Sequence, residues 1–271
     1  MNALPEHSVT SLDVIHHMDA LMLMDALPDA SIDAIITDMP YGTTACSWDT
    51  IVPFADWWPR VKRVLKPRGV FVTTASQPFT SALVMSNPAW FREELTWDKR
   101  LSTGFLDANR KHLKQHENVI VFSDGLPTYN PTMRRGVFRE KGGTKRHTVV
   151  YGSFKDQSNR NDTYYPTTIL AISNADQTNK QHPTQKPVAL YEYLIRTYTQ
   201  PGDVVLDPFC GSGTTAIAAR NTKRHYILGD FTREYVDIAR LRINGTGVDM
   251  LNAKDPAPLD ELPLFAQAVN A

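Results

Sequence analysis

Short apolar runs alternate with segments of helical spacing in the first half of the chain. Residues 20–27 form an amphipathic run, and the apolar run at 31–38 predicts a buried strand that ends where a proline removes the ladder donor. Apolar residues recur every three or four positions over 53–66, which predicts a helix closed by a Pro-Arg-Gly turn. Further strands are predicted at 69–76 and 117–123.

The last third of the chain repeats this alternation. A helix from about residue 188 is closed by Pro-Gly, and a strand follows at 203–207. A glycine loop, a small-residue helix at 214–220, a strand at 225–230 and a helix at 232–244 complete the pattern. Strands that alternate with helices indicate a mostly parallel sheet with helices on both faces, so the predicted fold class is a doubly wound, Rossmann-like α/β domain.

The middle of the chain lacks this periodicity. Residues 125–180 are rich in Gly, Pro, Asn, Thr, Tyr and Arg, and an aperiodic stretch of this length in a compact protein indicates an inserted functional module. The predicted organisation is one α/β domain in two halves, 1–124 and 181–247, that flank this irregular insert. Residues 248–271 are rich in Ala, Pro and Leu and carry few order signals, which predicts a C-terminal tail.

The composition of the 271 residues is that of a folded globular protein. Hydrophobic residues make up 42% and charged residues 21%, which excludes a chain disordered throughout. The two cysteines, Cys46 and Cys210, cannot form a disulfide framework or a zinc cluster, and the sequence has no metal-ligand spacing. The N-terminus lacks a secretory signal pattern and no apolar run approaches the roughly 20 residues of a membrane span, so we expect a cytoplasmic protein.

The formal net charge of zero hides an uneven distribution of charge. Residues 99–160 contain 13 Lys and Arg but 5 Asp and Glu, a local balance of +8, and the rest of the chain balances it at −8. Cations concentrated in one segment form either a solvated surface or the electrostatic footprint of a polyanion such as nucleic acid. The histidines and aromatic residues among them favour the polyanion.

The loop after residue 207 has the spacing of a cofactor-binding loop. Gly211, Gly213 and Ala216 follow a strand with GxGxxA spacing, and Asp230 ends the next strand, where it can accept hydrogen bonds from both hydroxyls of a ribose. Asp207 lies right beside the loop, where its carboxylate would repel a pyrophosphate but attract an ammonium group. The residues therefore favour S-adenosylmethionine, with NAD and a purely structural turn as alternatives.

Asp38, Met39, Pro40 and Tyr41 form a polar corner at the end of the buried strand, where ligands of open α/β sheets collect. The Asp38 carboxylate and the Met39 carbonyl could accept both hydrogens of an exocyclic amine, and Tyr41 could stack on the heterocycle that carries it. Two such acceptors would raise the reactivity of an amine whose lone pair is delocalised into the ring. The alternative is a strand-ending turn with a core tyrosine.

The two motifs together give the chain a family resemblance. Asp-Met-Pro-Tyr at 38–41 resembles the (Asp/Asn/Ser)-Pro-Pro-(Tyr/Phe/Trp) motif of DNA amino-methyltransferases, and the segment 207–215 resembles their S-adenosylmethionine loop. The order of catalytic motif, variable segment, His-Pro-Thr-Gln-Lys-Pro (182–187) and glycine loop is similar to the beta permutation of that family. Three further segments also resemble parts of the family: residues 63–71, 96–99 and 116–122.

The resemblance implies an enzyme that flips a base out of double-stranded DNA and methylates its amino group, and it suggests a homodimer. Asp38 and the Met39 carbonyl would orient the amine, with Pro40 fixing the corner and Tyr41 stacking on the base. The basic insert would be the target-recognition region. Its candidates for DNA contacts are Arg134, Arg135, Arg139, Lys141, Lys145 and Arg146.

The resemblance also assigns cofactor contacts to both halves of the domain. Asp207 would lie near the methionine end of the cofactor, Asp230 at its ribose and Asp19 at its adenine. The remaining implied contacts come from the glycine loop and the segment before it: His182, Lys186, Phe209, Gly211, Gly213 and Thr214.

Met39 departs from the family pattern, which usually has proline there, but the proposed contact is a backbone oxygen that methionine also supplies. An aspartate in the first position is more typical of adenine-N6 than of cytosine-N4 enzymes, so the resemblance favours adenine and leaves cytosine N4 as the alternative. Two more distant alternatives remain. One is an NAD-dependent dehydrogenase that uses only the glycine loop and Asp230, and the other is a DNA-binding protein whose methylation site has decayed.

Overall fold

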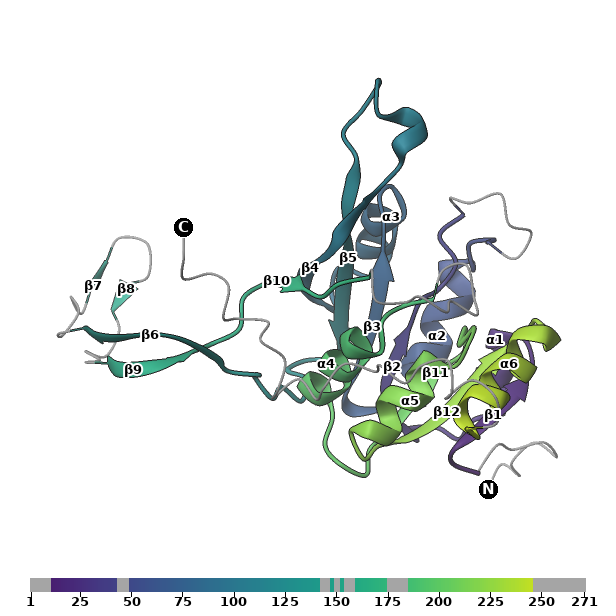
Figure 1. Cartoon of the computed structure of the whole chain (residues 1–271). Helices are drawn as coiled ribbons and strands as arrows, with labels where there is room; N and C mark the ends of the chain where they lie inside the picture. Colours follow the sequence, from purple (N-terminus) through teal and green to yellow (C-terminus); the bar gives the residue numbers. More distant parts are fainter. Residues whose placement is uncertain are drawn as a thin grey trace.

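The computed structural model of this chain describes residues 11–42, 49–141, 147–148, 152–153, 159–174 and 185–245. Within these ranges the central feature is an eight-stranded sheet of order β1-β12-β11-β2-β3-β5-β4-β10 (Figure 1). Its strands are β1 (Val14–His17), β2 (Ile32–Thr37), β3 (Leu65–Ala75), β4 (Phe91–Thr103), β5 (Lys114–Ser123), β10 (Ile169–Ala171), β11 (Val204–Asp207) and β12 (His225–Asp230).

The sheet is mostly parallel. The five neighbouring strands β1, β12, β11, β2 and β3 all run in the same direction. β5 runs antiparallel to both β3 and β4, and β10 pairs in parallel with β4 at the outer edge. The predicted doubly wound, Rossmann-like fold class is therefore confirmed.

Helices cover both faces of the sheet. One face packs against α1 (Ala20–Ala26), α2 (Phe54–Val64) and α3 (Phe79–Ser86), and the other packs against α4 (Val188–Tyr198) and α5 (Thr214–Asn221), with α6 (Arg233–Ile243) beside α5. Alternation along β2 explains the two cores, because Ala34 and Ile36 face α4 and α5 whereas Ile35 faces α1 and α2. In the part of the chain that the structure describes, no helix is long and apolar enough to cross a membrane.

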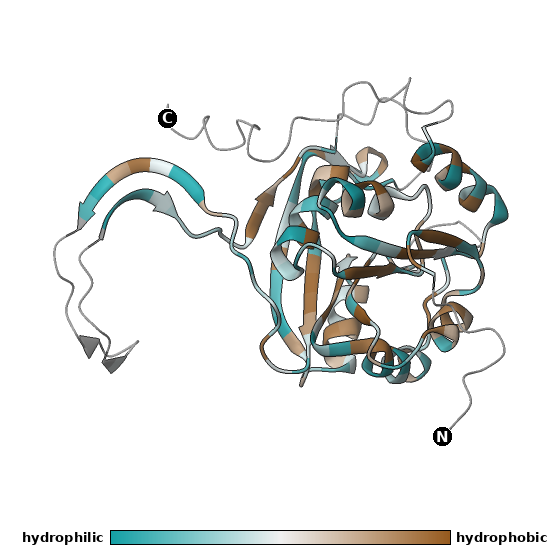
Figure 2. Ribbon diagram, turned by 90° about the horizontal axis from the view of Figure 1, so that it is seen from below, coloured by the Kyte–Doolittle hydropathy of each residue, from teal (hydrophilic) through white to brown (hydrophobic). Residues whose placement is uncertain are grey.

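The insert at 125–180 contains strands that its sequence did not predict. β6 (Arg134–Lys141) pairs antiparallel with β9 (Asn159–Tyr164), and β7 (His147–Thr148) pairs with β8 (Gly152–Ser153). β6 and β9 form a ribbon that stands away from the sheet (Figures 1 and 2). Most of β6 is exposed, so the ribbon has no buried face that would impose an alternating pattern on its sequence.

Both ends of the insert are fastened to the domain. The backbone N–H of Asn130 donates to the carbonyl of Thr197 over 2.7 Å, and its side-chain amide donates to the carbonyl of Thr199 over 2.9 Å. At the other end, Nε1 of Trp97 donates to the carbonyl of Ile172 over 2.8 Å. These bonds fix the points where the chain leaves the sheet and returns to it.

Candidate active site

A cavity of about 680 Å³ opens at the carboxyl ends of β2, β11 and β12. Because these strands are parallel, the residues that follow them meet at one edge of the sheet. The cavity is lined by members of both predicted motifs: Asp19, Asp38, Met39, Pro40, Tyr41, Lys186, Asp207, Phe209, Gly211, Thr214 and Asp230. The structure thus brings the predicted catalytic corner and the predicted cofactor loop together in one cavity.

Some predicted residues cannot be placed in this cavity. His182 lies outside the described residues, as do Lys145 and Arg146 and the proposed tail at 248–271. Gly213 is described but does not line the cavity, and it packs against Ala239 and Ile243 of α6. Among the described residues, no group of His, Cys, Asp and Glu side chains could hold a metal ion.

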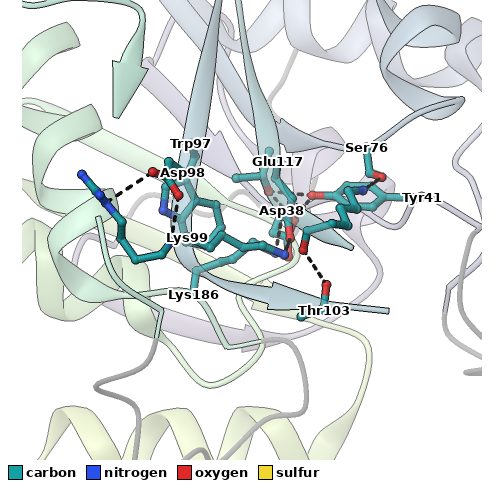
Figure 3. A network of polar contacts seen from close by, with 12 residues as sticks. Asp38, Tyr41, Ser76, Trp97, Asp98, Lys99, Thr103, Glu117 and Lys186 are labelled. Atoms are coloured by element: carbon teal, nitrogen blue, oxygen red, sulfur yellow. Dashed lines mark hydrogen bonds and ion pairs between the residues drawn. The ribbon is translucent and has the colours of Figure 1, made fainter. Parts of the chain in front are cut away.

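The Asp38 carboxylate is the centre of a polar network (Figure 3). Its Oδ1 accepts hydrogen bonds from the hydroxyls of Tyr41 and Thr74, whose two oxygens lie 2.7 Å apart. Its Oδ2 lies 2.5 Å from Nζ of Lys186. The Tyr41 ring stacks on Phe79 with ring centroids 5.3 Å apart. Tyr41 therefore orients the Asp38 carboxylate in addition to presenting an aromatic ring at the cavity.

Charged side chains from three elements meet beside Asp38. Nζ of Lys186 lies 3.5 Å from Oε2 of Glu117, and Nζ of Lys99 lies 3.1 Å from the other carboxylate oxygen of Glu117. Burial opposes the charge of Lys186, but the carboxylates of Asp38 and Glu117 outweigh it and raise the pKa of the lysine. Burial likewise disfavours the Glu117 carboxylate, yet Lys186 and Lys99 lower its pKa overall. Lys186 and Glu117 therefore stabilise each other's charged form.

Sequence reasoning missed Glu117, Lys99 and Thr74 as parts of the site. Glu117 and Lys99 lie in two of the segments that resemble the family, so the resemblance held a signal for them, whereas Thr74 had none. Lys99 was counted within the basic segment as part of a surface for a polyanion. It instead faces the cavity, as does Lys114, whose ammonium donates to the hydroxyl of Ser76.

The glycine loop has the backbone that only glycine adopts readily. Gly211 and Gly213 have φ values of +49° and +78°. A β-carbon at Gly213 would lie 2.9 Å from the β-carbon of Ala239 on α6, so the residue is also needed for close packing. Asp230 accepts hydrogen bonds from the backbone N–H groups of Gly211 (2.9 Å) and Thr232 (2.8 Å). Asp230 thus ties the loop to the start of α6.

Asp207 lies behind the loop and is 2% exposed. It accepts hydrogen bonds from the hydroxyls of Thr37 (2.6 Å) and Thr215 and from the backbone N–H of Phe209 (3.1 Å). These donors are neutral, and burial raises the pKa of Asp207 to about 7. A cation that binds beside Asp207 would therefore stabilise the ionised form of its carboxyl group.

The remaining predicted cofactor residues have structural partners. Asp19 caps α1, because its Oδ1 accepts hydrogen bonds from the backbone N–H groups of Leu21 (2.9 Å) and Met22 (3.1 Å). The hydroxyl of Thr214 donates to the carbonyl of Lys186 over 3.3 Å. The segment that carries Lys186 is thus attached to the glycine loop through its backbone and to Asp38 through its side chain.

Four of the candidate DNA contacts lie on β6. Arg135 and Arg139 are exposed, whereas Arg134 is half-buried and its Nε donates to the carbonyl of Tyr165 over 3.0 Å. Lys141 ends the same strand. Arg135 and Arg139 therefore lie on the ribbon that projects from the domain and do not line the cavity (Figure 1).

Two solved structures resemble this fold. The M1.HpyAVI–SAM complex is 25% identical with a TM-score of 0.57, and the match covers 84% of this chain and 98% of that one. The cytosine-N4-specific PvuII DNA methyltransferase is 22% identical with a TM-score of 0.60, over 87% of this chain and 88% of that one. The second likeness concerns the fold alone.

Sequence comparisons identify the family. The DNA methylase family model matches residues 32–241. The type II methyltransferase M.HpaI of Haemophilus parainfluenzae is 28% identical over 87% of this chain and 76% of its own length. M.BglII of Bacillus subtilis, also a type II methyltransferase, is 27% identical over 89% of this chain and 73% of its own length. The chain therefore belongs to the N6/N4 family of DNA methylases, as its two motifs and their shared cavity indicated.

Proposed function

We propose that this DNA methyltransferase acts on the N6 amine of an adenine flipped out of double-stranded DNA. Its cofactor is S-adenosylmethionine. The observation that carries the proposal is the position of the Asp38 carboxylate and the Met39 backbone in one cavity with the glycine loop. Two acceptors for an amine and a loop for a methyl donor are therefore within reach of a single bound base.

The donor set of the cavity fits the cofactor. S-adenosylmethionine supplies an electrophilic methyl group on a sulfonium centre. The buried Asp207 carboxyl would face its ammonium group, and Asp230, whose oxygens already hold two backbone N–H groups, would accept from the ribose. The other residues proposed to line the cofactor are Asp19, His182, Phe209, Gly211 and Thr214, whereas Gly213 packs the loop against α6 and Lys186 is proposed to position Asp38.

Asp38 and the Met39 carbonyl would each accept one hydrogen of the target amine. Drawing the nitrogen toward a tetrahedral shape restores its lone pair, which forms the new N–C bond while the C–S bond breaks in line with it. The nitrogen then releases one proton to water, so the products are a neutral methylamine and the thioether S-adenosylhomocysteine. Tyr41 would support the base with its ring, and Pro40 would hold the corner rigid.

The insert is proposed to bind the DNA duplex. A two-stranded ribbon fits the major groove, and the exposed Arg135 and Arg139 would contact phosphates or base edges there. Lys141, Lys145, Arg146 and the half-buried Arg134 complete this proposed surface. We also propose that the protein is a homodimer in the cytoplasm. The proposed units of the chain are two halves of the α/β domain that flank the insert, followed by a tail, with boundaries at residues 124, 180 and 247.

The test is to incubate the protein with unmethylated DNA and methyl-labelled S-adenosylmethionine, and to identify the modified nucleoside by mass spectrometry. N6-methyldeoxyadenosine is the expected product. N4-methyldeoxycytidine would overturn the choice of base but not the reaction, and the absence of a methylated nucleoside would contradict the proposed function.

An Asp38→Ala variant tests the role of the carboxylate in the same assay. We expect it to bind DNA and cofactor but to lose turnover by about a thousandfold, because an acceptor aimed at the amine is removed. Asp29→Ala, which removes a carboxylate on the surface, is the matched control. Turnover retained by Asp38→Ala would rule out the role assigned to Asp38.

A further inference from the structure

The hairpin of β4 and β5 extends beyond the rest of the sheet. The last residue of β3 to pair with β5 is Ala75, opposite Asn118, but β4 and β5 continue to the pair Thr103 and Lys114. β5 is antiparallel to both β3 and β4, so β4 runs in the same direction as β3. Because β3 is parallel to β2, β4 also runs in the direction of β2. The extension, residues 101–113, is called the finger here, and it projects past the edge that holds the cavity (Figure 1).

The base of the finger is part of the cavity wall. Lys99 and Thr103 on β4 line the cavity, as do Lys114 and Glu117 on β5. Glu117 is the carboxylate that lies 3.5 Å from Nζ of Lys186, the partner of Asp38. The finger therefore rises directly beside the place where a flipped base would bind.

The tip of the finger exposes large apolar side chains. Phe105 is 77% exposed and Leu106 is 87% exposed, in the short 3₁₀ turn η1 (Phe105–Asp107). Leu101 and Leu113 lie lower on the two sides and are 45% and 47% exposed. Adjacent apolar side chains that protrude this far into water are typical of a surface that binds a partner.

The charges around the tip indicate the chemistry of that partner. Arg100, Arg110 and Lys111 are exposed, and Asp107 is the only acidic residue of the finger. Lys111 pairs with Asp107 over 3.0 Å and Arg100 pairs with Asp98 over 3.3 Å, which leaves a positive balance around the apolar tip. A second copy of this chain would bring like charges together, whereas a polyanion is attracted.

We infer that the finger inserts into duplex DNA at the position vacated by the flipped base, with Phe105 and Leu106 stacking on the bases left behind. The inference rests on the proposed function only in requiring a base flipped from DNA, whichever base it is. Removing a base from the stack exposes apolar surface in the duplex, and an apolar side chain that fills the gap offsets this cost. Arg110 and Lys111 bind the phosphates beside the gap.

The first experiment compares Phe105→Ala/Leu106→Ala with wild type on duplexes that carry a site mapped by the methylation assay. One duplex is fully paired, and a second has a mismatch at the target base. We expect the double variant to lose about tenfold or more in kcat/KM on the paired duplex but to stay within about threefold on the mismatch, which is already partly unstacked. Met85→Ala, which truncates an exposed apolar side chain on α3, should match wild type on both.

The second experiment measures binding to a duplex with one abasic position and to its paired counterpart. Wild type should prefer the gap by about tenfold, and the double variant should not. If wild type shows no methylation but still prefers the abasic duplex, the proposed function is wrong, whereas the inference about the finger stands. Two results of the first experiment would overturn the inference: an equal loss on paired and mismatched duplexes, or no loss. It would also be overturned if wild type did not prefer the gap, or if the double variant changed in sedimentation.

Discussion

Nζ of Lys186 lies 2.5 Å from Oδ2 of Asp38 and 3.5 Å from Oε2 of Glu117. The lysine is thus shared between the carboxylate proposed to receive the target amine and a second carboxylate that belongs to the cavity wall. An amine hydrogen approaching Oδ2 competes with the ammonium group for the same lone pairs. Glu117 offers the lysine an alternative partner, so that Asp38 can accept the amine without leaving a buried cation unpaired.

A Lys186→Met substitution separates two roles for this residue. The family resemblance implies support of the cofactor, which predicts a higher Kd for S-adenosylmethionine. The geometry favours positioning of Asp38, so we expect kcat to fall by about tenfold while the Kd of the cofactor changes by less than about twofold. Single-turnover methylation and cofactor titration measure the two quantities. A loss confined to cofactor affinity would contradict the positioning role, and Lys62→Met on α2 is the control.

Asp207 should make stability depend on pH in an unusual direction. Its pKa is raised by burial from 3.8 to about 7, so folding favours the protonated carboxyl. Its contribution to stability is fully present below pH 3.8 and is lost as the pH rises through 7. Between pH 4 and pH 7, the wild-type free energy of unfolding should therefore fall by an amount on the order of a few kcal/mol relative to Asp207→Asn.

Urea denaturation of both proteins across this range measures the difference. An Asp29→Asn variant, which changes an exposed carboxylate, should follow the wild-type curve. If Asp207→Asn and wild type kept parallel curves, the raised pKa would be wrong. Because ionised Asp207 attracts a cation, wild type should also release protons when it binds S-adenosylmethionine near pH 7, as calorimetry in different buffers can detect.

Met39→Pro tests whether the corner works through its backbone. Met39 is 1% exposed and packs in the core, so losing its side chain should cost about 1–3 kcal/mol of stability. The carbonyl oxygen remains, and we expect kcat to stay within about threefold of wild type. Met39→Ala removes the same side chain without the proline ring and is the matched comparison. A folded Met39→Pro protein without turnover would show that the side chain itself takes part.

Arg135→Gln/Arg139→Gln tests the ribbon as a DNA-binding surface. If each arginine contacts one phosphate, the slope of log affinity against log salt concentration should fall by about 2 in magnitude. Cofactor affinity should not change, because the ribbon stands away from the cavity. Arg233→Gln, an exposed cation on α6, should leave the slope unchanged. An unaltered slope in the double variant would place the phosphate contacts elsewhere.

The elements predicted from sequence are those with one clear apolar face or a continuous apolar run. β2 and α2 are of this kind. β4 was not predicted, although it is thirteen residues long. Its buried positions are Leu95, Trp97 and Lys99, and the charged lysine interrupts the apolar pattern. Its alternation becomes visible only once Glu117 is known to pair with that lysine.

The candidate site was predictable where its residues are contiguous. The motif at Asp38 and the glycine loop each occupy a few adjacent positions, and topology then brings them to one edge. The contact between Asp38 and Lys186 spans 148 residues of sequence, and the role of Thr74 depends on the pairing of β2 with β3. Such partners are set by tertiary packing, which one sequence without its fold does not specify.

The insert is attached to the domain at Asn130 and at Ile172. Its ribbon can therefore change in evolution without changing the sheet and the cavity. Between Asn130 and β10 (Ile169–Ala171), mutations, insertions or deletions should leave the sheet, the cavity and the network around Asp38 in place. A lineage can therefore exchange the ribbon and keep the same chemistry. Under the DNA-binding role proposed for the ribbon, new target sequences would arise by replacing one surface segment, while the proposed roles of Asp38, Lys186 and Glu117 stay unchanged.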